Sequence, residues 1–165
     1  MNIDDAQIIN AYWADEIQKA WNEYLSLNTQ PNGEEIFLDF DDFLDMIWEQ
    51  SITAFDKPRE VQVVVDCNNQ LFISFGTPGF VSFEHQEDEL HDRKQPMTLP
   101  IICWIHTHPF GSAYFSGTDW NTIRTWEFHM NSAIVLGNNE RMLWTKERQD
   151  HTVFYRNGTI VEEEE

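Results

Sequence analysis

The sequence has few basic residues: 10 Lys and Arg stand against 29 Asp and Glu in 165 residues, a formal net charge of −19. A surface this acidic repels DNA and anionic membranes, so the composition argues against both as partners and favours a basic partner. Aromatic residues nevertheless make up 14% of the chain, far more than acidic disordered polypeptides contain. We therefore expect a folded domain with a substantial core.

Long apolar runs and cysteines are also scarce. No apolar run approaches the ~18 residues that span a bilayer, and the longest is Ile101–Ile105. The acidic start, Met1–Gln7, is not followed by an apolar segment, so it does not have the pattern of a secretory signal. Two cysteines, Cys67 and Cys103, do not form a disulfide framework in a chain of this length. We expect a cytoplasmic protein.

The spacing of apolar residues predicts an α/β (α+β) fold. Residues 4–27 carry them every three to four positions, the pattern of an amphipathic helix. The remaining predicted elements are a short strand at 35–40, a helix at 41–55, strands at 60–66, 71–75 and 80–84, a polar loop at 85–100, a central strand at 101–108, a helix at 118–130, closing strands at 133–136, 142–146 and 152–156, and a solvated acidic tail at 162–165. We divide the chain into an N-terminal helical extension (1–33), a main domain (34–156) and an acidic tail (157–165).

The segment most informative for function is His106-Thr107-His108-Pro109, followed by Ser116 and Asp119. On a strand, His106 and His108 project to the same side and can reach one ion together. Pro109 ends the strand, and the chain then enters a helix whose first turn contains Asp119. Two imidazoles and one carboxylate suit Zn²⁺ with an open position for water. Zinc lowers the pKa of such a water to about 7.

Attack of this water on a carbonyl needs a nearby base and a donor for the developing oxyanion. Ser116, at the mouth of the helix that contains Asp119, is the candidate donor. Its spacing to Asp119 also matches a helix capping box, a role compatible with the first because a cap would hold Asp119 in place. Two upstream residues, Glu60 and Glu84, are candidates for the base.

The pattern His106-x-His108-Pro109, six residues, Ser116, two residues, Asp119 resembles the signature of the JAMM (JAB or MPN-plus) zinc metalloproteases. The stretch Trp104–Pro109 is especially similar to AMSH-type deubiquitinases. The resemblance implies a curved, mostly antiparallel sheet flanked by helices, to which this chain adds an N-terminal helix. It also implies that Glu60, at the start of a strand after a helix, is the catalytic base rather than Glu84.

By resemblance, the expected activity is zinc-dependent hydrolysis of an amide or isopeptide bond, with one Zn²⁺ on His106, His108 and Asp119. The expected substrates are conjugates of ubiquitin or a ubiquitin-like protein, whose C-terminal tail lies in the cleft. The loop at 85–98 lies where the family often has an insertion beside that cleft. The alternatives are a general metallopeptidase, a hydrolase that trims a sulfur-carrier protein, and a non-catalytic interaction module that contains zinc.

Overall fold

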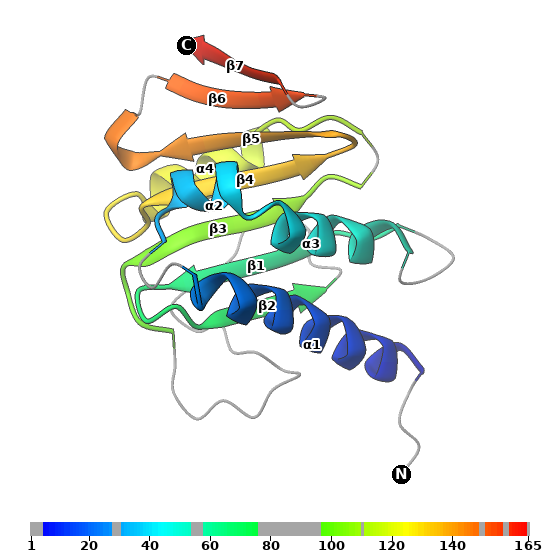
Figure 1. Ribbon diagram of the computed structural model, residues 1–165. Helices are drawn as coiled ribbons and strands as arrows, with labels where there is room; N and C mark the ends of the chain where they lie inside the picture. Colours follow the sequence, from blue (N-terminus) through cyan, green and yellow to red (C-terminus); the bar gives the residue numbers. More distant parts are fainter. Residues whose placement is uncertain are drawn as a thin grey trace.

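The computed structural model describes residues 5–27, 31–53, 58–75, 97–109, 111–148, 151–156 and 159–164. One seven-stranded sheet runs through the molecule in the order β2-β1-β3-β4-β5-β6-β7 (Figure 1). Neighbouring strands are antiparallel except β3 and β4, which are parallel. The predicted α+β fold with a mostly antiparallel sheet is therefore confirmed.

The strands are short and the central ones are buried on both faces. Their bounds are Val61–Asp66 (β1), Leu71–Phe75 (β2), Ile101–Thr107 (β3), Ser132–Gly137 (β4), Glu140–Thr145 (β5), His151–Arg156 (β6) and Thr159–Glu164 (β7). Every residue of β1 and of β4 is buried, and β3 is nearly so. The prediction of a central strand from the apolar run at 101–108 is confirmed.

Helices cover both faces of the sheet (Figure 1). Helices α1 (Asp5–Leu25), α2 (Gly33–Asp39) and α3 (Asp41–Thr53) lie on one face, and α4 (Gly117–Trp126) lies on the other. A short 3-10 turn, η2 (Lys146–Arg148), follows β5. Helix α4 connects the parallel pair β3 and β4, because parallel neighbours need a crossover that leaves the plane of the sheet. None of the described helices has the length and apolar character needed to cross a bilayer.

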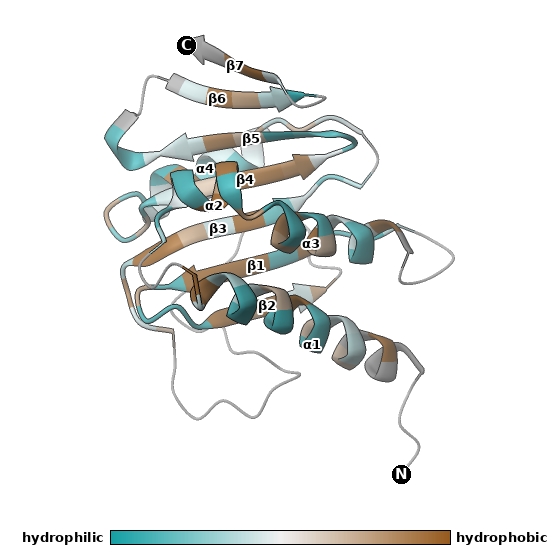
Figure 2. Cartoon of the chain, viewed as in Figure 1, coloured by the Kyte–Doolittle hydropathy of each residue, from teal (hydrophilic) through white to brown (hydrophobic). Residues whose placement is uncertain are grey.

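The sheet separates two apolar cores. One lies under α1, α2 and α3 and includes Trp21, Phe43 and Ile105, while the other lies under α4 and includes Trp104 and Trp126. Figure 2 shows the corresponding pattern, with brown along β1, β3 and β4 and teal on the outer sides of α1 and α3. Side chains alternate between the two faces along each strand, so neighbouring residues of one strand contribute to opposite cores.

Helix α1 is part of this structure. Trp21 is fully buried, its ring lies 4.9 Å from the Phe43 ring, and its indole N–H donates to the Asn69 carbonyl at 2.8 Å. These contacts join α1 to α3 and to the β1–β2 turn. The amphipathic pattern at 4–27 thus predicted the helix and the burial of Ile17 and Trp21, whereas Tyr12 is 57% exposed.

Four predictions about elements need correction or limits. The strand predicted at 35–40 is wrong: these residues belong mostly to α2, where Asn32 caps the helix by accepting the Glu35 N–H at 2.8 Å. The buried residues Gly33, Ile36 and Phe37 have helical spacing, which outweighs the β-propensity of the segment. The helix predicted at 118–130 ends at Trp126.

The prediction of an acidic tail at 162–165 is also wrong, because the segment Thr159–Glu164 pairs with β6 as strand β7. Pairing through main-chain groups at the outer edge of a sheet does not require apolar side chains. The strand predicted at 80–84 lies outside the described residues. Within the described part, the second neighbour of β1 is β3.

Candidate metal centre and adjoining cavity

His106 and His108 come from the end of β3. The His108 N–H donates to the Leu136 carbonyl at 2.8 Å, so hydrogen bonding to β4 continues one residue beyond the strand. The two imidazoles project to the same side, with ring centroids 5.1 Å apart and planes at 65°. Pro109 follows, where the ladder stops because proline has no N–H to donate. The expectation that His106 and His108 project to the same side of the strand is confirmed.

Asp119 is held by the cap of α4. The Ser116 hydroxyl oxygen accepts the Asp119 N–H at 3.1 Å, and the Ser116 N–H donates to Asp119 Oδ2 at 2.9 Å. This is a reciprocal capping box, which satisfies two N–H groups that the first helical turn would otherwise leave unpaired. The capping role predicted for Ser116 is therefore confirmed, and it orients the carboxylate of Asp119.

The two elements bring three potential ligands together. Asp119 Oδ2 lies 3.0 Å from His106 Nε2 and 3.1 Å from His108 Nε2. One potential ligand atom from each of the three residues lies within 4.8 Å of the corresponding atoms of the other two. His106 and Asp119 are buried, while His108 is partly open to solvent. The triad can hold a metal ion that remains accessible from the side of His108.

Two further observations fit a cation at this position. Both ring nitrogens of His106 are buried and have no hydrogen-bond partner among the described residues, although Nε2 is close to Asp119. A buried polar atom without a partner is costly, and a metal bond to Nε2 would satisfy it. Burial opposes ionisation of Asp119, but the nearby imidazoles of His106 and His108 and the N–H of Ser116 outweigh it, so the pKa of its carboxyl lies well below its usual range.

The ring of His106 is packed on an aromatic support. Trp104, two residues earlier on β3, stacks on His106 at a centroid distance of 4.3 Å and an interplanar angle of 13°. The Trp104 indole N–H donates to Gln62 Oε1 at 2.9 Å, and Gln62 is the residue of β1 that pairs with His106. Sequence reasoning missed Gln62. The signal that could have found it is a polar residue within an otherwise valine-rich strand.

Glu60 precedes β1 and is placed by the end of β3. The Val61 N–H donates to Thr107 Oγ1 at 2.9 Å, and the Thr107 hydroxyl lies 2.9 Å from Ser51 Oγ. Because Ser51 already donates to the Arg59 carbonyl, Thr107 is the donor of the second bond. This buried chain of hydroxyls fixes the segment next to Glu60 against the strand that carries the histidines.

Glu60 and His108 of the triad line one cavity of about 290 Å³. It is lined by Glu60, His108, Pro109, Gly111, Ser112, Tyr114 and Ser116. Glu60 is half-buried, and this burial raises the pKa of its carboxyl, with the Asp119 charge adding to the rise and the two histidines opposing it. A raised pKa is a property that suits a carboxylate that accepts and returns a proton.

The wall of the cavity between Pro109 and Ser116 is held by the β4–β5 turn. The Ala113 N–H donates to Glu140 Oε1 at 2.7 Å, and the Asn138 N–H donates to the Gly111 carbonyl at 2.8 Å. A Cβ on Gly137 would collide with the backbone of Gly111 and Ala113, so only glycine allows this close approach. Local sequence patterns could not reveal these contacts, because their partners are more than twenty residues apart.

The structure brings His106, His108 and Asp119 together, with Glu60 and Ser116 at the adjoining cavity. The other candidate base, Glu84, and most of the loop predicted at 85–98 lie outside the described residues. Comparisons with models of protein families, with curated proteins and with solved structures each found no match.

Proposed function

We propose that this protein is a zinc-dependent hydrolase of amide or isopeptide bonds, similar in mechanism to the JAMM metalloproteases. The observation that carries the proposal is the cavity in which Glu60 and Ser116 lie beside a His106–His108–Asp119 triad. Two imidazoles and one carboxylate favour zinc with an open position over a closed structural site, which usually has four protein ligands.

The residues divide the work as follows. His106, His108 and Asp119 hold the cation, and the capping box keeps the Asp119 carboxylate oriented. Zinc bound there would supply a Lewis acid and bring the pKa of a water towards neutrality. Glu60 accepts the proton of the attacking water and gives it to the leaving amine. The Ser116 hydroxyl, whose oxygen accepts the Asp119 N–H, keeps its own proton to donate to the substrate oxyanion.

The proposed substrate is a conjugate of ubiquitin or a ubiquitin-like protein, cleaved after its C-terminal residue. Such tails are often basic, and this chain has a net charge of −19. Tyr114 is 53% exposed on the cavity wall and contacts His108 edge-on at 4.9 Å, so it offers an aromatic surface to an extended tail. Charge complementarity of this kind chiefly accelerates association, so turnover at low substrate should fall as salt is added.

The test is hydrolysis of a panel of fluorogenic substrates: ubiquitin and ubiquitin-like conjugates, a sulfur-carrier fusion and unstructured peptides. We expect cleavage of a modifier conjugate that a chelator abolishes and zinc restores. Glu60→Gln should lose at least about 10²-fold in kcat while retaining zinc, and Asp39→Asn, an exposed carboxylate outside the cavity, should retain both. Cleavage of unstructured peptides alone would identify a general peptidase. Zinc binding without turnover of any substrate would identify an interaction module.

A further inference from the structure

The imidazole ring of His106 needs a support that its own covalent structure does not supply. The torsion that turns a histidine ring about its Cβ–Cγ bond has a broad, roughly two-fold preference. A histidine that binds a metal through one ring nitrogen is usually held by a hydrogen bond from the other nitrogen to a carboxylate or a carbonyl. In His106, Nε2 lies 3.0 Å from Asp119 Oδ2, while Nδ1 is buried and has no hydrogen-bond partner among the described residues. None of the described residues therefore orients the ring by that bond.

Trp104 supplies a different support. It lies two residues before His106 on β3, so both side chains project to the same face of the sheet. Their rings are stacked at a centroid distance of 4.3 Å, with planes 13° apart. Rotation of the imidazole about its Cβ–Cγ bond would drive an edge of the ring into the indole. The stack therefore fixes the plane of the imidazole, and the contact with Asp119 Oδ2 selects between its two edges.

The indole is itself anchored by Gln62 of β1. Gln62 lies opposite His106 in the register of β1 and β3, which places the two side chains on one face of the sheet. Its Oε1 accepts the Trp104 Nε1–H at 2.9 Å, and all three side chains are buried. Loss of the acceptor of a buried N–H is costly, so this bond holds the indole where it supports the imidazole.

From these contacts we infer that Gln62 and Trp104 are positioning residues for the metal site. Together they hold the plane of the His106 ring, which is the part that a second hydrogen bond usually plays at a histidine ligand. A ligand that must first be ordered binds less tightly than one already in place. Loss of either residue should therefore weaken zinc binding although the three ligands remain. The inference rests on the zinc site of the proposed function and is independent of the hydrolytic activity.

The experiment measures zinc affinity in a double-mutant cycle, by competition with a chromophoric chelator. Gln62→Met keeps the length of the side chain and removes the acceptor of the indole N–H. Trp104→Phe keeps an aromatic ring and removes the donor, and the double variant lacks both groups. Titration with Co²⁺ follows the same proteins, because the visible absorption of bound Co²⁺ depends on the arrangement of its ligands.

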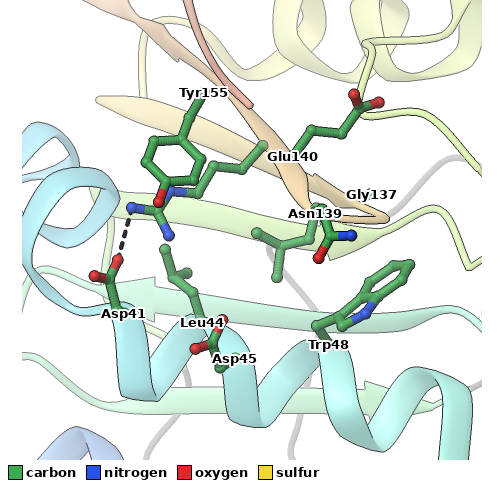
Figure 3. Close-up of a pocket in the computed structure, with 10 residues that line it drawn as sticks. Asp41, Leu44, Asp45, Trp48, Gly137, Asn139, Glu140 and Tyr155 are labelled. Carbon is green, nitrogen blue, oxygen red and sulfur yellow. Dashed lines mark hydrogen bonds and ion pairs between the residues drawn. The ribbon is translucent and has the colours of Figure 1, made fainter. Parts of the chain in front are cut away.

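Two control variants break polar contacts on the opposite face of the sheet. Ser132→Ala removes a buried hydroxyl that faces α2 and donates to the Ile102 carbonyl at 2.6 Å. Asp41→Asn removes the ion pair of α3 with the buried guanidinium of Arg141 at 2.7 Å (Figure 3). Both variants report what a general loss of stability does to zinc affinity, at a temperature where every protein is folded.

We expect each single variant to bind zinc about tenfold more weakly than the wild type, the lower end of the loss when the support of a metal ligand is removed. The double variant should bind about as weakly as Trp104→Phe alone, because Gln62 acts through the indole N–H. The Co²⁺ spectrum should change in these three variants and not in the controls. Undiminished zinc affinity in Gln62→Met, additive losses in the double variant, or equal losses in the controls would each overturn the inference.

The outcomes also separate this inference from the proposed function. Zinc binding by the wild type without turnover of any substrate would contradict the hydrolase and leave the positioning role intact. Turnover together with undiminished zinc affinity in every variant would contradict the positioning role alone. A wild type that binds no zinc would contradict both.

Discussion

Replacement of Ser116 separates its helix-capping role from its proposed role in hydrolysis. Ser116→Ala removes the oxygen that accepts the Asp119 N–H at 3.1 Å, while the main-chain bond from Ser116 to Asp119 Oδ2 remains possible. Loss of an N-cap to Ala costs about 1 kcal/mol. In a domain of this size, that loss lowers the melting temperature by roughly 2–4 °C.

Ser116→Gly has a different effect on stability and the same effect on the hydroxyl. Glycine is tolerated at the N-cap, so this variant should lose only about a few tenths of a kcal/mol. Both variants lack the proton proposed to reach the oxyanion, and loss of one such donor costs about 10²–10³ in kcat. We therefore expect Ala and Gly variants with similar low activity and different melting temperatures, while Ser116→Thr retains both properties.

The assay pairs thermal unfolding with initial rates on the best substrate of the fluorogenic panel, at equal zinc content. The Ala and Gly variants of Ser116 should have similar rates and different melting temperatures. If the rate instead follows the melting temperature, with the Gly variant near wild type, Ser116 acts only as a helix cap, and the proposed oxyanion donor must be another group.

Three further predictions concern stability. Burial raises the pKa of Glu60 above its unfolded value, so its ionised form destabilises the fold at neutral pH. In metal-free protein, Glu60→Gln should therefore raise the melting temperature at pH 7, and this gain should be lost below about pH 4.3. An equal gain at both pH values would contradict this prediction. Gly137→Ala should cost at least about 1–3 kcal/mol in denaturant unfolding, because the new Cβ meets the Gly111–Ala113 backbone; a neutral effect would show that this segment moves freely. Trp21→Ala should cost about 3–5 kcal/mol, and a loss under about 1 kcal/mol would mean that α1 packs only loosely.

Local periodicity was enough to predict the elements that position the site. Alternation along 101–108 correctly placed His106 and His108 on one side, and the Ser116–Asp119 spacing correctly predicted the cap. The same reasoning failed at 35–40, where helical burial of Ile36 and Phe37 outweighs local strand propensity.

Contacts between distant segments could not be predicted in this way. The support of His106 by Trp104 and Gln62 depends on the register between β1 and β3, which the pattern of neither strand specifies alone. The fit of Gly137 against the segment after Pro109 depends on the path of a connection that lacks periodicity. The acidic sequence at the end of β7 concealed a strand because its pairing uses main-chain groups.

Equilibrium zinc binding decides whether His106, His108 and Asp119 hold one zinc ion, as we propose. Competition with a chromophoric chelator should give one zinc per chain for the wild type and for Glu60→Gln. In Asp119→Asn, which loses the carboxylate charge, the affinity should fall by at least about tenfold. A wild-type chain that binds no zinc, or an Asp119→Asn variant with undiminished affinity, would mean that these three residues do not form a zinc site.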